Sequence, residues 1–360
     1  MRRYLLLVSL MIVSAWAASA QECRSCHPAI VQEWESSAHA MAHTSKNELY
    51  AKMVAAIASA KGVSHEAAQM RCNLCHAPLE EANISHEGVS CSVCHQIDTI
   101  KHRDATKPPV GRNMLVPMKE LVMSGPWDDA TSPYHGSVKR DFMQPSSDQL
   151  CLTCHQMMKN EQKVVVCATG VEHQASGEKK SCIECHMGAA IQGKISTLSS
   201  KERPMRSHRF LSARNSTLLA EAIKLSAHQE ARELAVTLIN RSSHNFPTGT
   251  AARFVTVEVE FIDAHGVVIA SQTTPLVAKF LDAEGKLTLP PLAVKAGEDS
   301  RLQPAETRVM RYSLPKKAKE ARVKIIYRLA SPTLAQKLGV KGEEWTKPRL
   351  VAEQRVSLKP

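Results

Sequence analysis

Hydrophobic and polar residues follow different patterns in the two halves of the chain. From about residue 213 onward, apolar and polar side chains alternate, most clearly at residues 234–238, 255–261 and 323–327. A period of two residues is typical of half-buried β-strands. Turn-forming segments at residues 264–266 and 283–285 separate such runs. We therefore expect seven or eight short strands, packed as an immunoglobulin-like antiparallel sandwich.

The first half of the chain lacks this alternation. Residues 47–60 and 65–70 carry Ala and Met at helical spacing and predict helices. Residues 104–149 are rich in Pro, Gly, Asp and Ser, which predicts a long irregular segment. Such a segment is unusual in an ordinary domain but expected where backbone wraps around bound groups. The predicted fold class is α+β, with a mostly helical and irregular domain at residues 21–212 and an all-β sandwich at residues 213–360.

One pentapeptide, C-x-x-C-H, occurs five times in the first half of the chain. This motif is the attachment signature of c-type heme: the two thiols bond to the vinyl groups, and the histidine is the proximal iron ligand. The predicted cofactor-binding residues are Cys23, Cys26, His27, Cys72, Cys75, His76, Cys91, Cys94, His95, Cys151, Cys154, His155, Cys182, Cys185 and His186.

The histidine makes this motif specific. A C-x-x-C pair alone could be a redox dithiol, half of a zinc site or a disulfide. Only 16 of the 360 residues are histidine, so five chance occurrences directly after five such pairs are very improbable. We therefore expect five covalently bound hemes c. The eleventh cysteine, Cys167, follows an apolar run and is predicted to be a buried structural thiol.

The N-terminus has the pattern of a secretory signal peptide. Arg2 and Arg3 precede the apolar stretch Tyr4–Ala17, and the small residues Ala18–Ala20 form a cleavage site. We expect residues 1–20 to be removed, which leaves a periplasmic or extracellular protein without an integral membrane anchor. An uncleaved N-terminal anchor is the alternative, although the apolar stretch is short for a membrane span.

The formal charge of +11 suggests an anionic partner, but the expected cofactors account for most of it. Each heme brings two propionates, so five hemes nearly neutralise the chain, and lysine and arginine suit the binding of these carboxylates. We therefore predict no nucleic-acid partner. Aromatic residues make up only 4% of the chain, which is low for an ordinary core. Hemes would supply the missing apolar bulk, so we expect folding of the first half to depend on them.

The second axial ligand of each iron decides between electron transfer and catalysis. Of the 16 histidines, five belong to the motifs, and the other eleven would suffice for five bis-histidine hemes. If His244 binds iron, it fixes the sandwich onto the heme-binding domain. The predicted metal ligands are His27, His76, His95, His155, His186, His39, His43, His135, His208 and His244. The alternatives left open are His86, His102, His173, Met157, Met158, Met187 and Met205.

Several segments resemble a known family. They are Trp34 with Ser37–Ala40, Gly88–Ser90 before the third motif, Met187 directly after the fifth, and the 207–210 and 244–249 segments. Together they are similar to the multiheme cytochromes c related to the tetraheme cytochrome c of ammonia oxidisers. The resemblance implies stacked bis-histidine hemes in a periplasmic or extracellular electron carrier. It also implies distal ligand roles for His39, His135 and His208. One departure is Glu172-His173, where the family has an acidic residue and then Trp.

The leading functional hypothesis is electron transfer between a membrane quinol-oxidising partner and a terminal reductase or extracellular acceptor, as in anaerobic respiration. No catalytic side chain is then needed, and the predicted partners are quinol dehydrogenases, terminal reductases or outer-membrane cytochromes. One alternative is an oxidoreductase acting on nitrite, hydroxylamine or a sulfur oxyanion at one open heme. Against it, all five motifs end in histidine, whereas pentaheme nitrite reductases typically carry one lysine variant. The other alternative is a homo-oligomeric subunit of an extracellular cytochrome filament.

Overall fold

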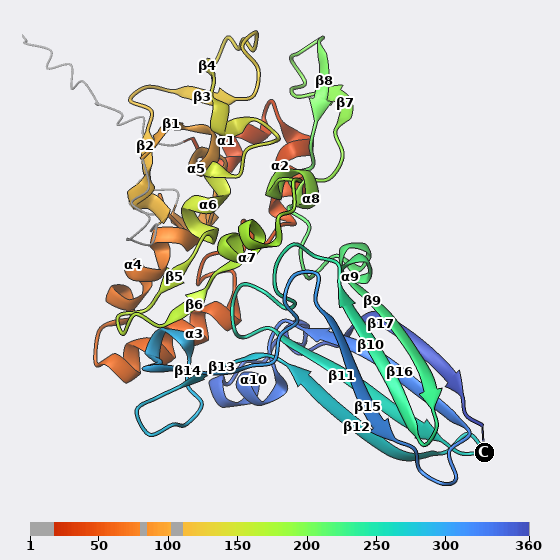
Figure 1. Cartoon of the computed structure of the whole chain (residues 1–360). Helices are drawn as coiled ribbons and strands as arrows, with labels where there is room; N and C mark the ends of the chain where they lie inside the picture. Colours follow the sequence, from red (N-terminus) through yellow and green to blue (C-terminus); the bar gives the residue numbers. More distant parts are fainter. Residues whose placement is uncertain (1–17, 80–84, 102–110, 360) are drawn as a thin grey trace, which may run out of the picture.

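A computed structural model describes residues 18–79, 85–101 and 111–359. The predicted signal peptide lies outside the described residues except for its last three positions, and His102 lies outside them as well. Figure 1 shows helices and short strands in the first part of the chain and long paired strands in the second. The predicted α+β class, a mostly helical and irregular part followed by an all-β part, is confirmed.

The first part of the chain is built from short helices joined by loops. Its helices are α1 (Ala20–Arg24), α2 (Pro28–Glu35), α3 (Glu48–Lys61), α4 (His65–His76), α5 (Cys91–His95), α6 (Gln149–His155), α7 (Thr169–Ser176) and α8 (Cys182–His186). The two predicted helices are present as α3 and α4. Helix α4 is longer than predicted because it runs on through the second C-x-x-C-H motif to His76.

Short strand pairs and single turns of 3-10 helix connect these helices. The pairs are β1 (Ile97–Ile100) with β2 (Leu115–Pro117), β3 (Val122–Gly125) with β4 (Gly136–Lys139), β5 (Met158–Lys159) with β6 (Val165–Cys167), and β7 (Ile191–Lys194) with β8 (Glu202–Met205). The single turns are η2 (Ser85–Glu87), η3 (Gly111–Met114) and η4 (Asp141–Met143). The segment predicted to be irregular therefore contains β2, β3 and β4, which are too short to show a period in sequence.

The second part forms two packed antiparallel sheets after the short helix α9 (Ser216–Ala222). One sheet has the order β15 (Thr307–Ser313), β10 (Glu233–Asn240) and β9 (Ile223–Glu230). The other has the order β12 (Val268–Leu276), β11 (Phe254–Ile262), β16 (Glu320–Arg328) and β17 (Arg349–Ser357). Three and four strands are the sheet sizes of an immunoglobulin-like sandwich. Outside these sheets lie β13 (Ala278–Leu281), β14 (Lys295–Asp299), α10 (Pro332–Leu338), η5 (Pro290–Leu292) and η6 (Glu343–Trp345).

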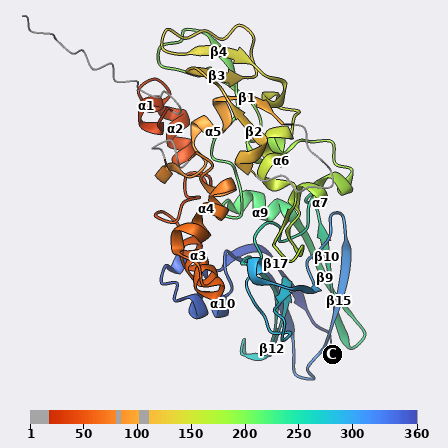
Figure 2. The same cartoon turned by 90° about the vertical axis from the view of Figure 1, so that its left-hand side faces the viewer.

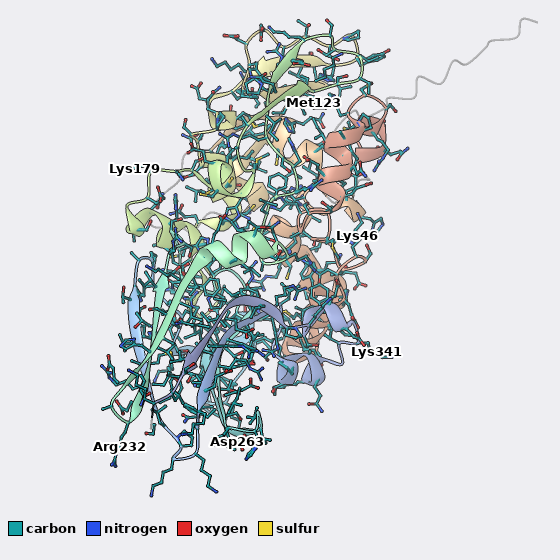
Figure 3. All side chains as sticks on the ribbon, turned by 90° about the vertical axis from the view of Figure 1, so that its right-hand side faces the viewer. Lys46, Met123, Lys179, Arg232, Asp263 and Lys341 are labelled. Carbon is teal, nitrogen blue, oxygen red and sulfur yellow. The ribbon has the colours of Figure 1, made fainter. Side chains whose placement is uncertain are left out.

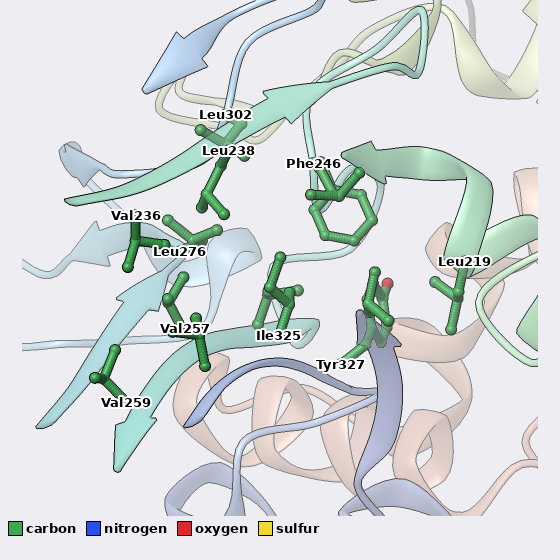
Figure 4. Close-up of a cluster of buried hydrophobic side chains, with 14 of the residues drawn as sticks. Leu219, Val236, Leu238, Phe246, Val257, Val259, Leu276, Leu302, Ile325 and Tyr327 are labelled. Atoms are coloured by element: carbon green, nitrogen blue, oxygen red, sulfur yellow. The ribbon is translucent and has the colours of Figure 1, made fainter. Parts of the chain in front are cut away.

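The sandwich core follows from the alternation in the sequence. Val255, Val257, Val259 and Phe261 of β11 are all 0% exposed. Figure 4 shows side chains of both sheets, among them Val236, Leu276 and Ile325, facing one another across this core. The three alternating runs named from the sequence are β10, β11 and β16, so these strand predictions are confirmed.

The two parts of the chain pack against each other through α3. Its residue Leu49 belongs to the sandwich core cluster, together with Trp345 of η6. The carboxylate of Glu48 accepts hydrogen bonds of 2.8 Å from the backbone N–H groups of Lys341 and Gly342. Figure 2 shows α3 beside α10. The long dimension of the molecule runs from Met123 in β3 to Arg232 and Asp263 at the opposite end (Figure 3). Among the described residues, no helix is long and apolar enough to cross a membrane.

Candidate cofactor-binding cavity

All five C-x-x-C-H motifs line one cavity in the first part of the chain. Its volume is about 2390 Å³, well beyond the range of about 300–1,000 Å³ that is usual for a single small-molecule site. Leu218 and Tyr327 from the second part of the chain also line it, so the sandwich closes one side. A cavity this large and shared fits several bulky groups in contact better than one ligand.

Local helix geometry presents the motif residues to this cavity. Helices α4, α5, α6 and α8 all end at a motif histidine, and the first motif spans the end of α1 and the start of α2. Residues three and four apart lie on one face of a helix, so the two thiols and the imidazole of each of the four helical motifs lie on one face. The close approach of η3 to α4 depends on Gly111, where a Cβ would lie 1.9 Å from the carbonyl oxygen of Leu74.

Thiols from different motifs lie close enough to shift one another's pKa. Cys91 lowers the pKa of Cys23, Cys154 raises the pKa of Cys75, and Cys151 raises the pKa of Cys182. Cys94 of the third motif is linked to the fourth: burial raises its pKa to about 12, with contributions from Cys151 and Cys154. All five motifs thus form one connected series, in which the fourth contacts the second, third and fifth. The cofactors attached there would be closely packed.

Four motif histidines each face a second histidine across the cavity. The ring centroids are 6.5 Å apart for His27 and His135, 6.3 Å for His155 and His39, 6.2 Å for His95 and His208, and 6.3 Å for His186 and His244. The partners are four of the five predicted distal histidines. Two metal–nitrogen bonds of about 2.0 Å each separate facing nitrogens by about 4 Å, and the ring radii account for the remainder. These pairs therefore have the spacing of rings that share a metal ion.

Backbone carbonyls orient most of these rings. Nδ1 of His27 lies 2.5 Å from the carbonyl oxygen of Ile195, and Nδ1 of His95 lies 2.8 Å from that of Ser124. The same contact occurs at His186, His135, His208 and His244, with distances of 2.6, 2.9, 3.1 and 3.1 Å to Leu211, Gly136, Arg206 and Asn245. A ring that donates from Nδ1 leaves Nε2 as the basic nitrogen, which is the usual outer-shell arrangement of a metal-binding histidine.

Burial keeps several of these imidazoles neutral. It lowers the pKa of His39 to about 3 and the pKa of His208 and His244 to about 4. It also lowers the pKa of His95 and His155. A neutral imidazole is the form that binds metal, so the side chains present fit iron ligands.

His76 is the exception among the motif histidines. Among the described residues, no histidine ring faces it at the spacing of the other pairs. Its stacked neighbour is Tyr50 of α3, at a centroid distance of 4.5 Å and an interplanar angle of 18°. This distance is too short for a metal ion between the rings and is typical of offset stacking. The Tyr50 hydroxyl donates to Oδ1 of Asn73 at 3.2 Å, so Tyr50 supports His76 from the side.

His43 does not lie opposite a motif histidine. Its Nδ1 lies 2.7 Å from Oγ of Ser45, its Nε2 lies 3.2 Å from Nε2 of Gln69, and its ring packs edge-on against His86. Because both ring nitrogens contact side chains, this geometry argues against the predicted ligand role of His43. His173, an alternative, is likewise engaged at both nitrogens: its Nδ1 lies 2.8 Å from Oγ of Ser243, and its Nε2 lies 3.5 Å from Oδ2 of Asp148.

Two cavity-lining residues, Cys167 and Tyr50, were not predicted from the sequence to lie there. Cys167 is half-buried at the end of β6, with its Sγ 3.7 Å from Oγ1 of Thr169. It therefore lines the cavity instead of lying within a core. Tyr50 was not predicted, because its role depends on the packing of α3 against α4. Its only local signal was the helical spacing of the segment.

The loop that carries His244 is held by a buried carboxylate. Glu172 of α7 accepts hydrogen bonds through Oε2 from the Thr248 hydroxyl at 2.5 Å and from the Asn245 N–H at 3.2 Å. Its Oε1 lies 3.3 Å from Nη1 of Arg301. In the family resemblance, Glu172 is the expected acidic residue, and the departure is His173 in place of Trp. In the structure, Glu172 lies between the two parts of the chain and contacts both.

Replacing Glu172 with alanine should loosen this loop. Hydrogen bonds to a charged group contribute about 1.5–3 kcal/mol each, so we expect a loss of stability of about that size, measured as the denaturant midpoint of the holoprotein. Glu172→Gln keeps an acceptor for Thr248 and Asn245, so we expect it to lose less than half as much stability as Glu172→Ala. Equal destabilisation by both variants would contradict the hydrogen-bonding role. The charge of Glu172 alone would then stabilise the loop.

Comparison with known proteins supports the same assignment. Residues 22–96, which contain the first three motifs, match the family model described as cytochrome c554 and c-prime. The solved structure of a penta-heme cytochrome c552 from Thermochromatium tepidum superposes with a TM-score of 0.77 at 23% identity. The match covers 95% of this chain and 99% of that one. This chain has the fold of a multiheme c-type cytochrome. The resemblance seen in the sequence is therefore supported by the family match over residues 22–96 and by the shared fold.

The remaining comparisons add little. An endonuclease/exonuclease/phosphatase from Beutenbergia cavernae matches over 38% of this chain and 23% of its own, at 14% identity and a TM-score of 0.15. The structural genomics target SoR45 matches over 38% of this chain and 84% of its own, at 11% identity and a TM-score of 0.18. Both scores are too low to indicate a shared fold. No curated protein shows significant similarity to this chain.

Proposed function

We propose that this cytochrome binds five c-type hemes and carries electrons between redox proteins outside the cytoplasm. The observation that carries the proposal is the set of four histidine pairs at 6.2–6.5 Å, which share one cavity with five attachment motifs. Paired histidine ligation is typical of low-potential hemes that transfer electrons and do not bind substrate. When bound, the hemes supply one-electron chemistry of iron.

The side chains then have the following proposed roles. The ten motif cysteines attach the cofactors, and the five motif histidines are proximal ligands. His135, His39, His208 and His244 are the distal partners of His27, His155, His95 and His186. The Nδ1 contacts with backbone carbonyls hold the rings in one tautomer, which fixes their orientation and raises their basicity.

The organisation around this centre is also part of the proposal. We place the boundary between the heme-binding domain and the sandwich at residues 212/213, just before α9. Export through a signal peptide at residues 1–20 would bring the chain to the compartment where c-type hemes are attached. Quinol dehydrogenases, terminal reductases or outer-membrane cytochromes are the proposed partners, and the sandwich is a candidate module for docking them.

The proposal is tested by the mass of the denatured protein. We expect it to exceed the mass of the mature chain by five hemes, because thioether links survive denaturation. A single variant with Cys91 and Cys94 both replaced by Ala should carry one heme fewer. Replacing Cys167, which belongs to no motif, should leave the mass increment unchanged. A wild-type protein with no covalent heme would refute the proposed function.

A second candidate function rests on His76. No histidine of the described residues faces it, and in this candidate function a small molecule would occupy the distal side of the heme proposed at the second motif. An open distal site is what an oxidoreductase acting on nitrite or hydroxylamine needs. A high-spin ferric signal that changes on addition of nitrite or hydroxylamine would favour this function. An entirely low-spin spectrum that neither compound alters would favour the electron carrier.

A further inference from the structure

Polar atoms of Arg214 and Tyr327 lack hydrogen-bond partners where the sandwich meets the cavity, beside Arg253. Arg214, Arg253 and Tyr327 all line it. Nη2 of Arg214 and the hydroxyl of Tyr327 are buried, and neither has a hydrogen-bond partner within the described part of the chain. Tyr327 is only 2% exposed. A buried polar group without a partner costs about 1–3 kcal/mol, so this arrangement calls for a bound polar group.

Packing fixes the three side chains. The Arg214 guanidinium lies over the Trp345 ring, 5.3 Å from its centroid, directly before α9. The Tyr327 ring meets Phe246 edge-on at 5.9 Å. Figure 4 shows Tyr327 at the edge of the sandwich core, on the side of Leu219 in α9. Arg253 donates from Nη1 to the carbonyl oxygen of Thr248 at 2.7 Å. The three groups thus form a preorganised corner of the cavity wall.

This corner carries positive charge. Burial lowers the pKa of Arg214, and the charge of Arg253 lowers it further, while Glu344 acts in the opposite direction. The nearby Arg301, by contrast, is paired with Asp299 and Glu172 at 2.7 and 3.3 Å. Two neighbouring guanidinium groups beside an unpaired hydroxyl match a carboxylate, which can accept hydrogen bonds from all three.

The position of the corner indicates where such a carboxylate comes from. Arg253 donates to the carbonyl oxygen of Thr248, which lies in the same loop as His244. The His244 ring faces His186 of the fifth motif at a centroid distance of 6.3 Å. A carboxylate in this corner would therefore be close to the iron proposed between His186 and His244.

We propose that Arg214, Arg253 and Tyr327 bind a propionate of the heme that His186 and His244 would hold. This inference rests on the proposed function, because it requires covalent heme at the fifth motif. The sandwich then holds the cofactors at two points, through a distal histidine and through this carboxylate. Its two arginines also favour the reduced, more negative form of the adjacent center, which raises its reduction potential.

The test is a potentiometric titration of the holoprotein, followed by visible spectroscopy and EPR. Arg214→Gln should shift the midpoint potential of one center to more negative values and leave the covalent heme count unchanged. Arg214→Lys, which keeps the charge, should shift it less. Tyr327→Phe should give a smaller shift of the same center. Arg232→Gln, at the opposite end of the sandwich in Figure 3, is the matched control and should change none of the potentials.

The outcomes separate the possible sources of the anion. Acetate or sulfate added to the wild-type protein should have no effect, because the corner is already occupied. If either anion shifts the potential and Arg214→Gln abolishes that response, the corner binds a free anion and the inference is overturned. Unchanged potentials in both Arg214→Gln and Tyr327→Phe would overturn it as well. If the mass of the denatured wild-type protein shows no covalent heme, the proposed function itself is refuted.

Discussion

Prepared without covalently attached heme, the chain should lose the folded structure of residues 23–211 and keep the β-sandwich. The cavity of about 2390 Å³ would then have to collapse or fill with water. At about 24 cal/mol per Å³ of void, an empty cavity of that size would cost tens of kcal/mol. A domain has only about 5–15 kcal/mol of net stability. The protein's own apolar contacts there are small clusters, such as Val54, Ala58 and Ala68.

Limited proteolysis followed by mass spectrometry would measure this effect. We expect the apo chain to yield a resistant fragment that begins between residue 213 and β9, and to lose most of its helical circular dichroism signal. The holoprotein under the same conditions is the control and should resist cleavage between α3 and α8. Because Leu49 packs into the sandwich core, the fragment should also be less stable than the sandwich of the holoprotein. An apo chain that keeps α3 and α4 protected would contradict the prediction.

The sequence predicted the sandwich well because its signal is local and repeated. Val255, Val257, Val259 and Phe261 alternate with polar residues, and only one sheet face can bury all four. The short pairs β3–β4 and β7–β8 could not be predicted in the same way. Strands of four residues show hardly two periods of alternation, and their pairing depends on the chain around the cavity.

The candidate site likewise contains some residues that local sequence predicts and others that depend on the tertiary structure. The motif residues were predictable because attachment needs two thiols and an imidazole on one helical turn. Distal partners need a ring brought across the cavity from elsewhere in the chain, which no spacing rule specifies. His39 and His43 are one helical turn apart in sequence, yet His39 faces His155 while His43 contacts Ser45 and Gln69.

The His244 loop depends both on its own sequence and on tertiary contacts with the first part of the chain. Its histidine comes from the sandwich, while Glu172, which accepts hydrogen bonds from Asn245 and Thr248, comes from α7 of the first part. Asn240 at the end of β10 donates to the carbonyl oxygen of His244 at 2.9 Å. The ring is therefore positioned from both sides, so its removal should affect one iron without disturbing the loop.

Replacing His244 with alanine should convert about one fifth of the heme iron, that held by His186, from low-spin to high-spin. The His186 and His244 ring centroids are 6.3 Å apart, and no other histidine ring of the described residues faces His186 at this spacing, so none of those histidines is placed to substitute. EPR of the oxidised protein and its visible spectrum would measure the change. His244→Met should keep that center low-spin but raise its reduction potential, since methionine ligation favours the reduced iron.

His265→Ala is the matched control, because His265 lies in an exposed turn of the same sandwich. It should leave the spectrum unchanged. If His244→Ala also leaves the spectrum unchanged while the covalent heme count stays at five, the distal role of His244 is wrong. The sandwich would then contact the heme-binding domain through its packing against α3 and through polar contacts such as that of Glu172 with Thr248, without supplying an iron ligand. A change confined to His244→Ala would instead make the sandwich an integral part of the redox center, since it would supply an iron ligand itself.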